Sequence, residues 1–150
     1  RNRLEKAAEL GATATINPGE VDDVVEAVRE ETGGGVDHAV ETTGVPDVAE
    51  QAVETLTQRG ELAVVGAPAL GSRASFDVNN LILNGRSITG VVEGDSNPTE
   101  FIPDLIELYR QGKFPFDELV SYYDFDEIQA AVEASEAGTA IKPILRVSEP

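Results

Sequence analysis

The sequence predicts an α/β fold with a mostly parallel, doubly wound sheet, and two observations support this. Segments with helical and strand periodicity alternate over residues 1–65. The run at residues 62–65 is short and wholly apolar, as in a strand that is covered on both faces. Alternation of this kind is typical of right-handed crossovers between parallel strands. At 150 residues the chain is long enough to form one domain with a core.

The first third of the chain gives the first two helices. Residues 1–10 have leucine and alanine at helical spacing, and a glycine follows them. Residues 12–17 form a short β-branched run that we expect to be extended. Valines at i, i+3, i+4 and i+7 over residues 21–28 predict an amphipathic helix, which the glycines at 33–35 end.

The middle of the chain gives the predicted crossovers. Residues 36–41 form a strand, and a helix begins with Pro46 in its first turn and ends at Gly60. The apolar strand at 62–65 follows. Beyond it we expect an extended piece at 76–78, helical turns at 79–84 and a strand at 86–92. Helix and strand alternate less regularly here than over residues 1–65.

The last third begins at Asn97, where the next residue is proline and a glutamate follows two positions later, as at a helix start. This helix should bury an apolar stripe formed by Ile102, Leu105, Ile106 and Tyr109. Residues 122–125 are expected to be extended, and Asp126 to cap a last helix. That helix should turn inward Ile128, Ala131 and Val132. A strand at 141–147 closes the chain.

The charge balance is strongly acidic, with 28 Asp and Glu residues against 11 Lys and Arg and a net charge of −17. The acids are spread along the chain, which favours a solvated surface adapted to high salt over an acidic partner-binding face. Nucleic-acid binding needs basic patches, so it is disfavoured. No apolar run approaches the ~18 residues that a membrane helix needs. The sequence has no cysteine, which fits the cytoplasm.

The dinucleotide-binding version of this fold needs a Gly-rich turn between its first strand and first helix. The pattern G-x-G-x-x-G does not occur, and the glycines at 33–35 follow a helix and precede a strand, the wrong order for a phosphate cradle. We therefore expect an incomplete doubly wound sheet that lacks the first strand, the Gly-rich turn and the second strand. The opening helix would then follow the missing ribose-binding acid.

Several segments together resemble the carboxyl-terminal part of the zinc-dependent medium-chain alcohol dehydrogenases. They are RLEKAAELGATATIN, GGGVDHAVETTG, GELAVVGAP and AIKPILRV, in the family's order and spacing. The segments VVEGDSNP and GKFPFD are most similar to aryl-alcohol (benzyl-alcohol) dehydrogenases.

The resemblance implies that residues 1–150 are the carboxyl-terminal portion of a Rossmann-type NAD-binding domain, with residues about 120–150 returning toward an absent catalytic domain. It implies hydride transfer from a primary aryl alcohol to NAD, with NADP as the alternative, and a catalytic zinc held by the absent domain. This chain would hold no catalytic residue and no metal ligand, so alone it would be inactive. Two other functions stay open: a zinc enzyme for another alcohol, polyol or formaldehyde adduct, and a non-catalytic nucleotide-binding or interaction module.

The cofactor-binding residues come partly from the resemblance and partly from their position at strand ends. Thr42, Thr43 and Gly44 end a strand where the adenine would rest, or simply form a turn. By resemblance, Val65, Gly66 and Ala67 line the nicotinamide, as do Val91, Val92 and Glu93; core packing is the alternative for the valines.

Three cations also match or suggest cofactor contacts. Arg3 matches a ribose contact, with a solvent-facing arginine as the alternative. Lys142 matches a pyrophosphate contact, with a surface lysine as the alternative. Arg1 would reach the 2′-phosphate of NADP, or it is a frayed terminus.

Two further polar residues have ordinary explanations. Glu41 ends a strand and is expected to be a structural acceptor rather than a catalytic acid. His38 lies in the middle of a strand without metal-ligand spacing around it, so we expect a buried or interface histidine with a satisfied proton.

Two expectations concern assembly and affinity. The strand at 86–92 should lie at the edge of its sheet, and the family's dimers join their sheets here, so we expect a homodimer through residues near 75–95. Without the phosphate-binding turn, the 150-residue chain should bind NAD weakly or not at all.

Overall fold

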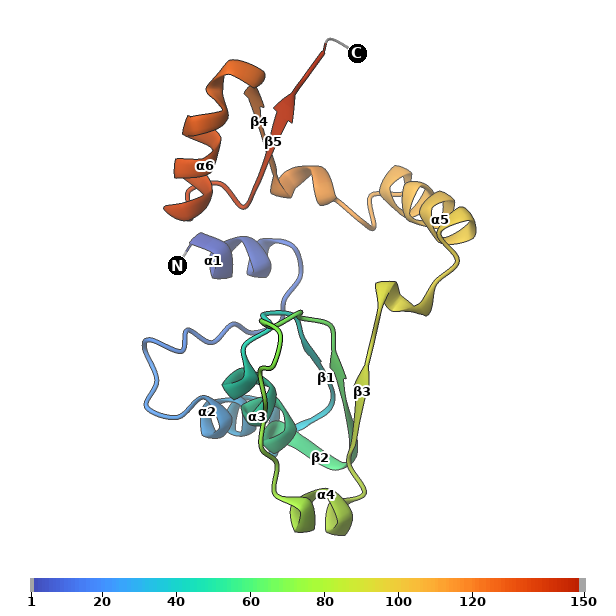
Figure 1. Ribbon diagram of the computed structural model, residues 1–150. Helices are drawn as coiled ribbons and strands as arrows, with labels where there is room; N and C mark the ends of the chain where they lie inside the picture. The colour runs from blue at the N-terminus through green and yellow to red at the C-terminus, as the bar shows by residue number, and fades with distance from the viewer. Residues whose placement is uncertain (1, 149–150) are drawn as a thin grey trace. The chain divides into compact units, whose positions relative to one another are not determined.

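The computed structural model describes residues 2–148, and the chain divides into two compact units (Figure 1). We refer to residues 16–96 as the central region. Residues 2–15 together with 97–148 form the flanking region. The described elements are mixed α and β, and the strands pair in parallel, which confirms the predicted fold class.

The central region contains a three-stranded sheet in the order β1-β2-β3, with both neighbouring pairs parallel. A helix connects each strand to the next, so the region is two successive βαβ crossovers. This confirms the predicted crossover from residues 36–41 to residues 62–65, whereas the predicted crossover from residues 12–17 to residues 36–41 does not form. The elements in chain order are α2 (Val24–Thr32), β1 (Val36–Glu41), α3 (Pro46–Thr55), β2 (Leu56–Val64), α4 (Val78–Asn84) and β3 (Ser87–Gly90).

Local sequence signals explain where these helices begin and end. The side chain of Asp23 accepts a hydrogen bond from the backbone N–H of Glu26 at the start of α2, and that of Asp77 accepts one from Asn80 at the start of α4. Helix α2 ends at Gly33, whose φ of 72° is left-handed and therefore suits glycine. Helix α3 begins with Pro46, as expected.

The core of the central region lies between the sheet and α3, which packs against β1 and β2. Val53 of α3 meets Leu56 and Leu62 of β2, and these three side chains are 4%, 1% and 0% exposed. Helix α2 packs against α3. The core therefore fixes β1 and β2 relative to each other, and with them the position of their carboxyl ends.

The flanking region contains one more crossover, in which β4 and β5 pair in parallel and α6 connects them. Asn97 caps the start of helix α5: its side chain accepts a hydrogen bond from the N–H of Thr99. The elements are α1 (Asn2–Glu9), α5 (Pro98–Arg110), β4 (Val120–Asp124), α6 (Ile128–Glu136) and β5 (Lys142–Arg146), with 3-10 turns at Phe116–Leu119 and Phe125–Glu127.

Three features differ from the sequence prediction: one strand, one helix boundary and the number of sheets. Residues 12–17 do not form a strand, because no described strand lies beside them to complete their hydrogen bonds. The helix that starts at Pro46 ends at Thr55, and the chain continues directly into β2, which includes a left-handed Arg59. The described strands form two separate sheets instead of one.

Two predictions of inward-facing residues were wrong at least in part, and so was one predicted helix cap. The stripe on α5 is largely open, with Ile102 54% and Ile106 46% exposed, because no described element covers this face. On α6, Ala131 is buried but Ile128 and Val132 are exposed. Asp126 does not cap α6; Asp124 and Glu127 form a capping box around the preceding turn.

In the part of the chain that the structure describes, no helix combines the length and the apolar character that crossing a bilayer requires.

Candidate functional site

The three parallel strands of the central region end level with one another. In the register of the sheet, Glu41 lies opposite Val64, and Val64 lies opposite Gly90. The residues that follow these strands therefore leave the same side of the sheet (Figure 1). We call residues 42–44, 65–67 and 91–93 the carboxyl edge. It contains nine of the eleven predicted cofactor-binding residues.

Backbone hydrogen bonds connect the three segments of the carboxyl edge. The N–H groups of Val65 and Gly66 both donate to the carbonyl oxygen of Glu41, at 2.9 and 3.0 Å. The N–H of Val91 donates to the carbonyl oxygen of Val64 at 3.0 Å. The edge is thus one connected surface whose three segments have a defined spacing.

The carboxylate of Glu41 organises the first of these segments. Its side chain is buried, at 3% exposure. Its Oε1 accepts hydrogen bonds from the N–H of Thr43 at 2.5 Å, the hydroxyl of Thr43 at 2.5 Å and the N–H of Gly44 at 2.9 Å. The hydroxyl of Thr43, above all, lowers the pKa of Glu41 from its ordinary value of 4.5, against the opposing effect of burial.

Glu41 is therefore a structural acceptor, as the sequence predicted. A carboxylate that three donors hold in its charged form is a poor general base, because taking up a proton would weaken those bonds.

Two glycines let the first two segments approach each other closely. A Cβ on Gly66 would lie 2.1 Å from the backbone N of Gly44 and 2.7 Å from Oε2 of Glu41. Gly44 itself has a φ of 70°, and a Cβ there would lie 3.0 Å from the backbone of Ala67. No side chain fits between the two turns, so the edge presents backbone groups and small residues. Such a surface suits the close approach of a ligand.

The outer part of the carboxyl edge is open. Val65 is 46% exposed and Val92 74% exposed, and Thr42, Thr43 and Ala67 are exposed as well. Past β3 the chain turns through left-handed residues, with a φ of 51° at Glu93. This conformation is costly for a residue with a side chain, and such residues gather at ligand-binding sites.

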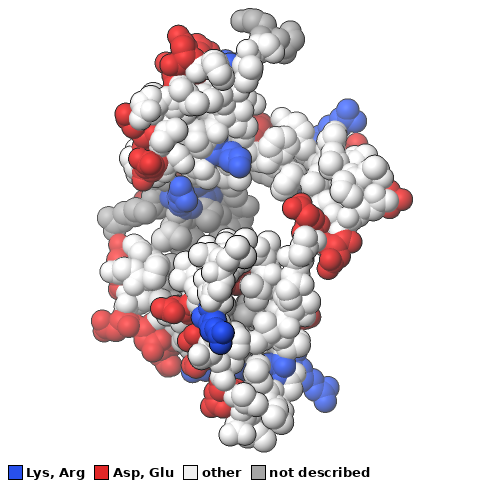
Figure 2. Space-filling view, viewed as in Figure 1, with Lys and Arg blue, Asp and Glu red and all other residues white. Residues whose placement is uncertain are grey.

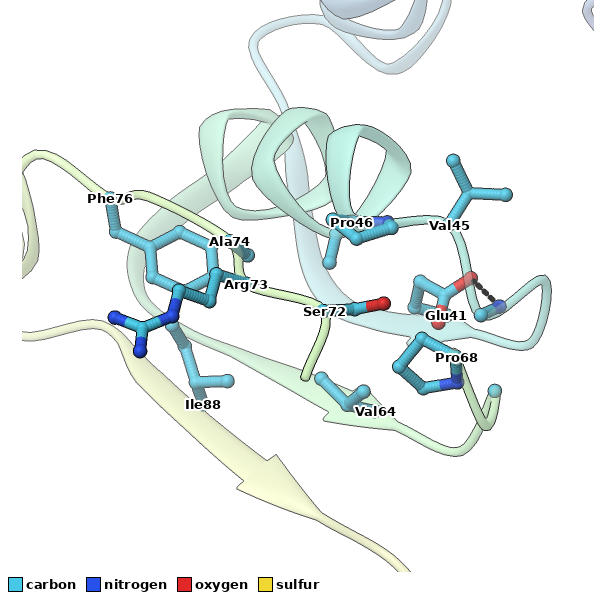
Figure 3. Close-up of a pocket in the computed structure, with 13 residues that line it drawn as sticks. Glu41, Val45, Pro46, Val64, Pro68, Ser72, Arg73, Ala74, Phe76 and Ile88 are labelled. Atoms are coloured by element: carbon cyan, nitrogen blue, oxygen red, sulfur yellow. Dashed lines mark hydrogen bonds between the residues drawn. The ribbon is translucent and has the colours of Figure 1, made fainter. Parts of the chain in front are cut away.

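An open, mostly apolar pocket of about 240 Å³ adjoins the edge on the side of α3 (Figure 3). Val64 and Ile88 of the sheet contribute to its wall, with Pro46 of α3 and with Pro68 and Phe76 of the segment that follows β2. Glu41 lies at the end of this pocket near the edge, and the dashed line in Figure 3 marks one of its hydrogen bonds.

Two predicted cofactor-binding residues lie elsewhere in the chain. Arg3 is on α1 and Lys142 begins β5; both are exposed and both belong to the flanking region. The carboxyl edge belongs to the central region, so the role of both residues stays a prediction. The suggestion for Arg1 falls outside the described residues.

The residues present do not suit a zinc ion. The sequence has no cysteine and one histidine, and residues 2–148 contain no group of three or more His, Cys, Asp or Glu arranged to hold a metal. His38 is exposed on β1, so the first alternative, a buried histidine, was wrong, and the second, an interface histidine, stays a prediction. It lies on a strand with one neighbouring strand, β2.

Sequence reasoning missed the contact between Gly44 and Gly66 and the pocket beside it. The signal for the contact is slight: each glycine comes shortly after a strand. The segment at 68–76 has no periodicity, so nothing predicted that it would form a pocket wall.

Comparison with known proteins assigns the family. The family model described as zinc-binding dehydrogenase matches residues 1–111, well over half of the chain. The chain belongs to the zinc-binding dehydrogenase family. This confirms the resemblance drawn from the sequence motifs.

Relatives of this dehydrogenase chain match almost all of it. A geraniol dehydrogenase of Castellaniella defragrans is 39% identical over 143 residues, which are 95% of this chain and 38% of that protein. The crystal structure of benzyl alcohol dehydrogenase from Acinetobacter calcoaceticus is 52% identical over 98% of this chain and 40% of its own, with a TM-score of 0.93. An alcohol dehydrogenase zinc-binding domain protein from Burkholderia ambifaria is 54% identical over 99% of this chain and 40% of its own, with a TM-score of 0.92. The chain thus spans about two fifths of the length of these relatives.

Proposed function

We propose that this chain is the cofactor-binding part of a longer dehydrogenase that transfers a hydride from a primary aryl alcohol to NAD. One observation carries the proposal: three parallel strands end level and form a connected, open edge with close backbone approach. In open α/β sheets, ligands bind at this end of the strands. The bound nicotinamide would supply the hydride acceptor.

Each segment of the carboxyl edge has a proposed partner on the cofactor. Residues 42–44 contact the adenine side, and residues 65–67 and 91–93 contact the nicotinamide. The exposure of Val65 and Val92 supports this, since both offer apolar surface at the end of the sheet. The backbone groups beside them are suited to hydrogen bonds with the carboxamide. Glu93 would contribute through its backbone, and its side chain would face the substrate side or solvent.

Two residues of the flanking region complete the proposed set. Arg3 would contact the adenosine ribose, and Lys142 the pyrophosphate. Both are cations with exposed side chains in a strongly acidic chain. Replacing Lys142 with glutamine should weaken NADH binding a few-fold, about what the loss of one exposed charge contact produces. Residues about 120–150 would return the chain toward a catalytic domain.

The proposed substrate class follows from the relatives. One acts on benzyl alcohol and another on geraniol, both primary alcohols, by their names. The higher identity to the benzyl alcohol enzyme favours an aryl substrate. Zinc would be held by other parts of the polypeptide, because the described residues do not suit it.

The test is an alcohol oxidation assay on the complete polypeptide that carries these residues. Benzyl alcohol, geraniol and a diol are supplied in turn with NAD or NADP, and reduced cofactor is followed by its absorbance. We expect turnover with benzyl alcohol and NAD. We also expect a zinc chelator to abolish turnover and to leave NADH binding unchanged. A polypeptide that binds neither NADH nor NADPH would refute the proposal and favour an interaction module.

We also propose that the enzyme is a homodimer joined through residues near 75–95. In the described sheet, β3 is an edge strand. Helix α4, which precedes β3 in the chain, exposes Val78, Ile82 and Leu83 at 64%, 70% and 81%. An edge strand next to exposed apolar side chains favours pairing with a second copy. Light scattering that finds only monomer at micromolar concentration and high salt would contradict this.

The acidic surface supports adaptation to high salt. On the face shown in Figure 2, Asp and Glu side chains are scattered over both regions instead of forming one patch. At a net charge of −17, self-repulsion destabilises the fold when salt is low. We expect the free energy of unfolding to rise between ~0.1 and ~2 M KCl, since the Debye length falls below about 3 Å in that range. Urea titrations at the two salt concentrations test this.

A further inference from the structure

We propose that Glu41 is a positioning residue for the cofactor: it holds two segments of the carboxyl edge at the spacing that a dinucleotide needs. The inference rests on the proposed function and extends it to a residue that does not itself touch the ligand. It goes beyond the sequence prediction of a structural acceptor. It assigns to Glu41 an effect on the binding of the cofactor and none on the binding of the alcohol.

The first part of the argument is the turn after β1. Three donors, two from Thr43 and one from Gly44, converge on the single oxygen Oε1. Charged acceptors form hydrogen bonds roughly twice as strong as neutral ones. With the carboxylate removed, these donors would lack a partner in a part-buried place, and the turn would rearrange. The turn is the segment proposed to face the adenine.

The second part is the contact with the segment after β2. The carbonyl oxygen of Glu41 accepts from Val65 and Gly66. On the same residue, Oε2 lies so close to Gly66 that a Cβ there would be 2.7 Å away. Glu41 therefore contacts both the adenine segment and the nicotinamide segment, and Figure 3 shows its side chain among the residues that line the pocket. The backbone bonds remain when the side chain is replaced, so a substitution acts on the adenine segment through Oε1 and on the nicotinamide segment through the packing of Oε2 against Gly66.

The test compares NADH and NADPH binding and steady-state kinetics of the complete polypeptide with those of three variants. Glu41→Ala removes the acceptor, and Glu41→Gln keeps its size and one oxygen but loses the charge. Glu61→Gln is the matched control. It removes the same charge from the same sheet, and the side chain of Glu61 accepts a hydrogen bond from the hydroxyl of Thr89, away from the carboxyl edge. All measurements are made at a temperature where circular dichroism shows each protein folded.

We expect Glu41→Ala to raise the Kd for NADH and the KM for NAD about tenfold or more, as when hydrogen-bonding groups lose their partner. Glu41→Gln should raise them about threefold, since neutral acceptors are weaker. The KM for benzyl alcohol at saturating NAD should change less than about twofold, because the alcohol does not contact this turn. Glu61→Gln should bind NADH like the wild type.

Wild-type affinity in a folded Glu41→Ala protein would overturn the inference, and so would equal effects of Glu41→Gln and Glu61→Gln. Equal increases of the KM for alcohol and for NAD would reduce Glu41 to a structural residue. If Glu41→Ala does not fold, Glu41→Gln decides: an unchanged NADH affinity overturns the inference. If the wild type binds neither NADH nor NADPH, the proposed function itself fails, a result that no Glu41 variant can produce.

Discussion

The central and flanking regions use the same parallel crossover but differ in how well they enclose their apolar side chains. In the central region, Leu56 and Leu62 are almost completely buried. In the flanking region, the buried apolar residues are the small Ala131 and Ala140, and α5 leaves its larger side chains half exposed.

The difference shows what a crossover needs to form a core. In the central region, α3 lies on two paired strands and α2 packs against it, so the apolar faces meet. In the flanking region, α6 lies on β4 and β5, but no described element covers the stripe of α5. The buried core packs on the strands β1 and β2 that lead into the carboxyl edge, and these strands define the spacing of their ends. We expect the central region to dominate the stability of the chain.

The largest effect should come from Gly66→Ala, at the contact between the two turns. The new Cβ would lie 2.1 Å from the backbone N of Gly44, and neither backbone can give way without breaking the bonds to Glu41. We expect a loss of about 4 kcal/mol or more, at the upper end for single substitutions. Urea unfolding measures it.

The control is Gly90→Ala at the end of β3. A Cβ there would meet nothing within 4 Å, so we expect stability to stay the same or rise by about 0.5 kcal/mol. Equal losses at Gly66 and Gly90 would mean that the close approach of the turns is not what matters.

A pair of leucines compares the two regions directly. Leu62→Ala removes a side chain that is 0% exposed and should cost about 3 kcal/mol in transfer and cavity terms. Leu108→Ala on α5 removes one that is 39% exposed and should cost under about 1 kcal/mol. Urea unfolding of both variants sharpens the comparison. A larger loss of unfolding free energy for Leu108→Ala than for Leu62→Ala would contradict the claim that the central region holds the better-enclosed core.

The smallest effect is the contribution of Glu41 to the pH dependence of stability. Its pKa is lowered in the folded state, so its contribution is fully present above the ordinary value of 4.5 and is lost as the pH falls through the lowered value. Glu41→Gln should therefore reduce the steepness of acid destabilisation below about pH 4.5 and lower stability at neutral pH. Urea titrations at several pH values test this. An unchanged acid profile would show that other carboxylates account for it.

The sequence predicted those elements correctly whose apolar face is covered by another element of the described chain. The strand at 36–41, the helix from Pro46 and the apolar run at 62–65 were found because each belongs to a crossover that buries its own apolar face. The predictions failed for segments that have no other described element packed against them. The β-branched run at 12–17 reads as a strand and the stripe on α5 reads as buried, yet a periodic pattern cannot say whether another element covers it.

For the candidate site, the sequence predicted where the residues lie in the sheet better than it predicted the contacts that they make. Residues 42–44 were placed at a strand end from the pattern, and residues 65–67 and 91–93 by resemblance to the family; all nine lie on one edge. The three donors on Glu41 depend on the exact course of a turn, and the contact of Gly66 with Gly44 joins residues that are distant in the sequence. Neither leaves a periodic signal. Arg3 and Lys142 were predicted by resemblance alone, and their role stays a prediction.

The central claim is that the carboxyl edge binds a dinucleotide, and hydrogen exchange of the complete polypeptide with and without NADH tests it most directly. Mass spectrometry of its peptides would follow exchange at residues 41–46, 64–68 and 90–94, with α2 and α5 as internal references. The account predicts that NADH slows exchange in the three edge segments and leaves both helices unchanged. Slower exchange elsewhere, with the edge segments unaffected by saturating NADH, would contradict it.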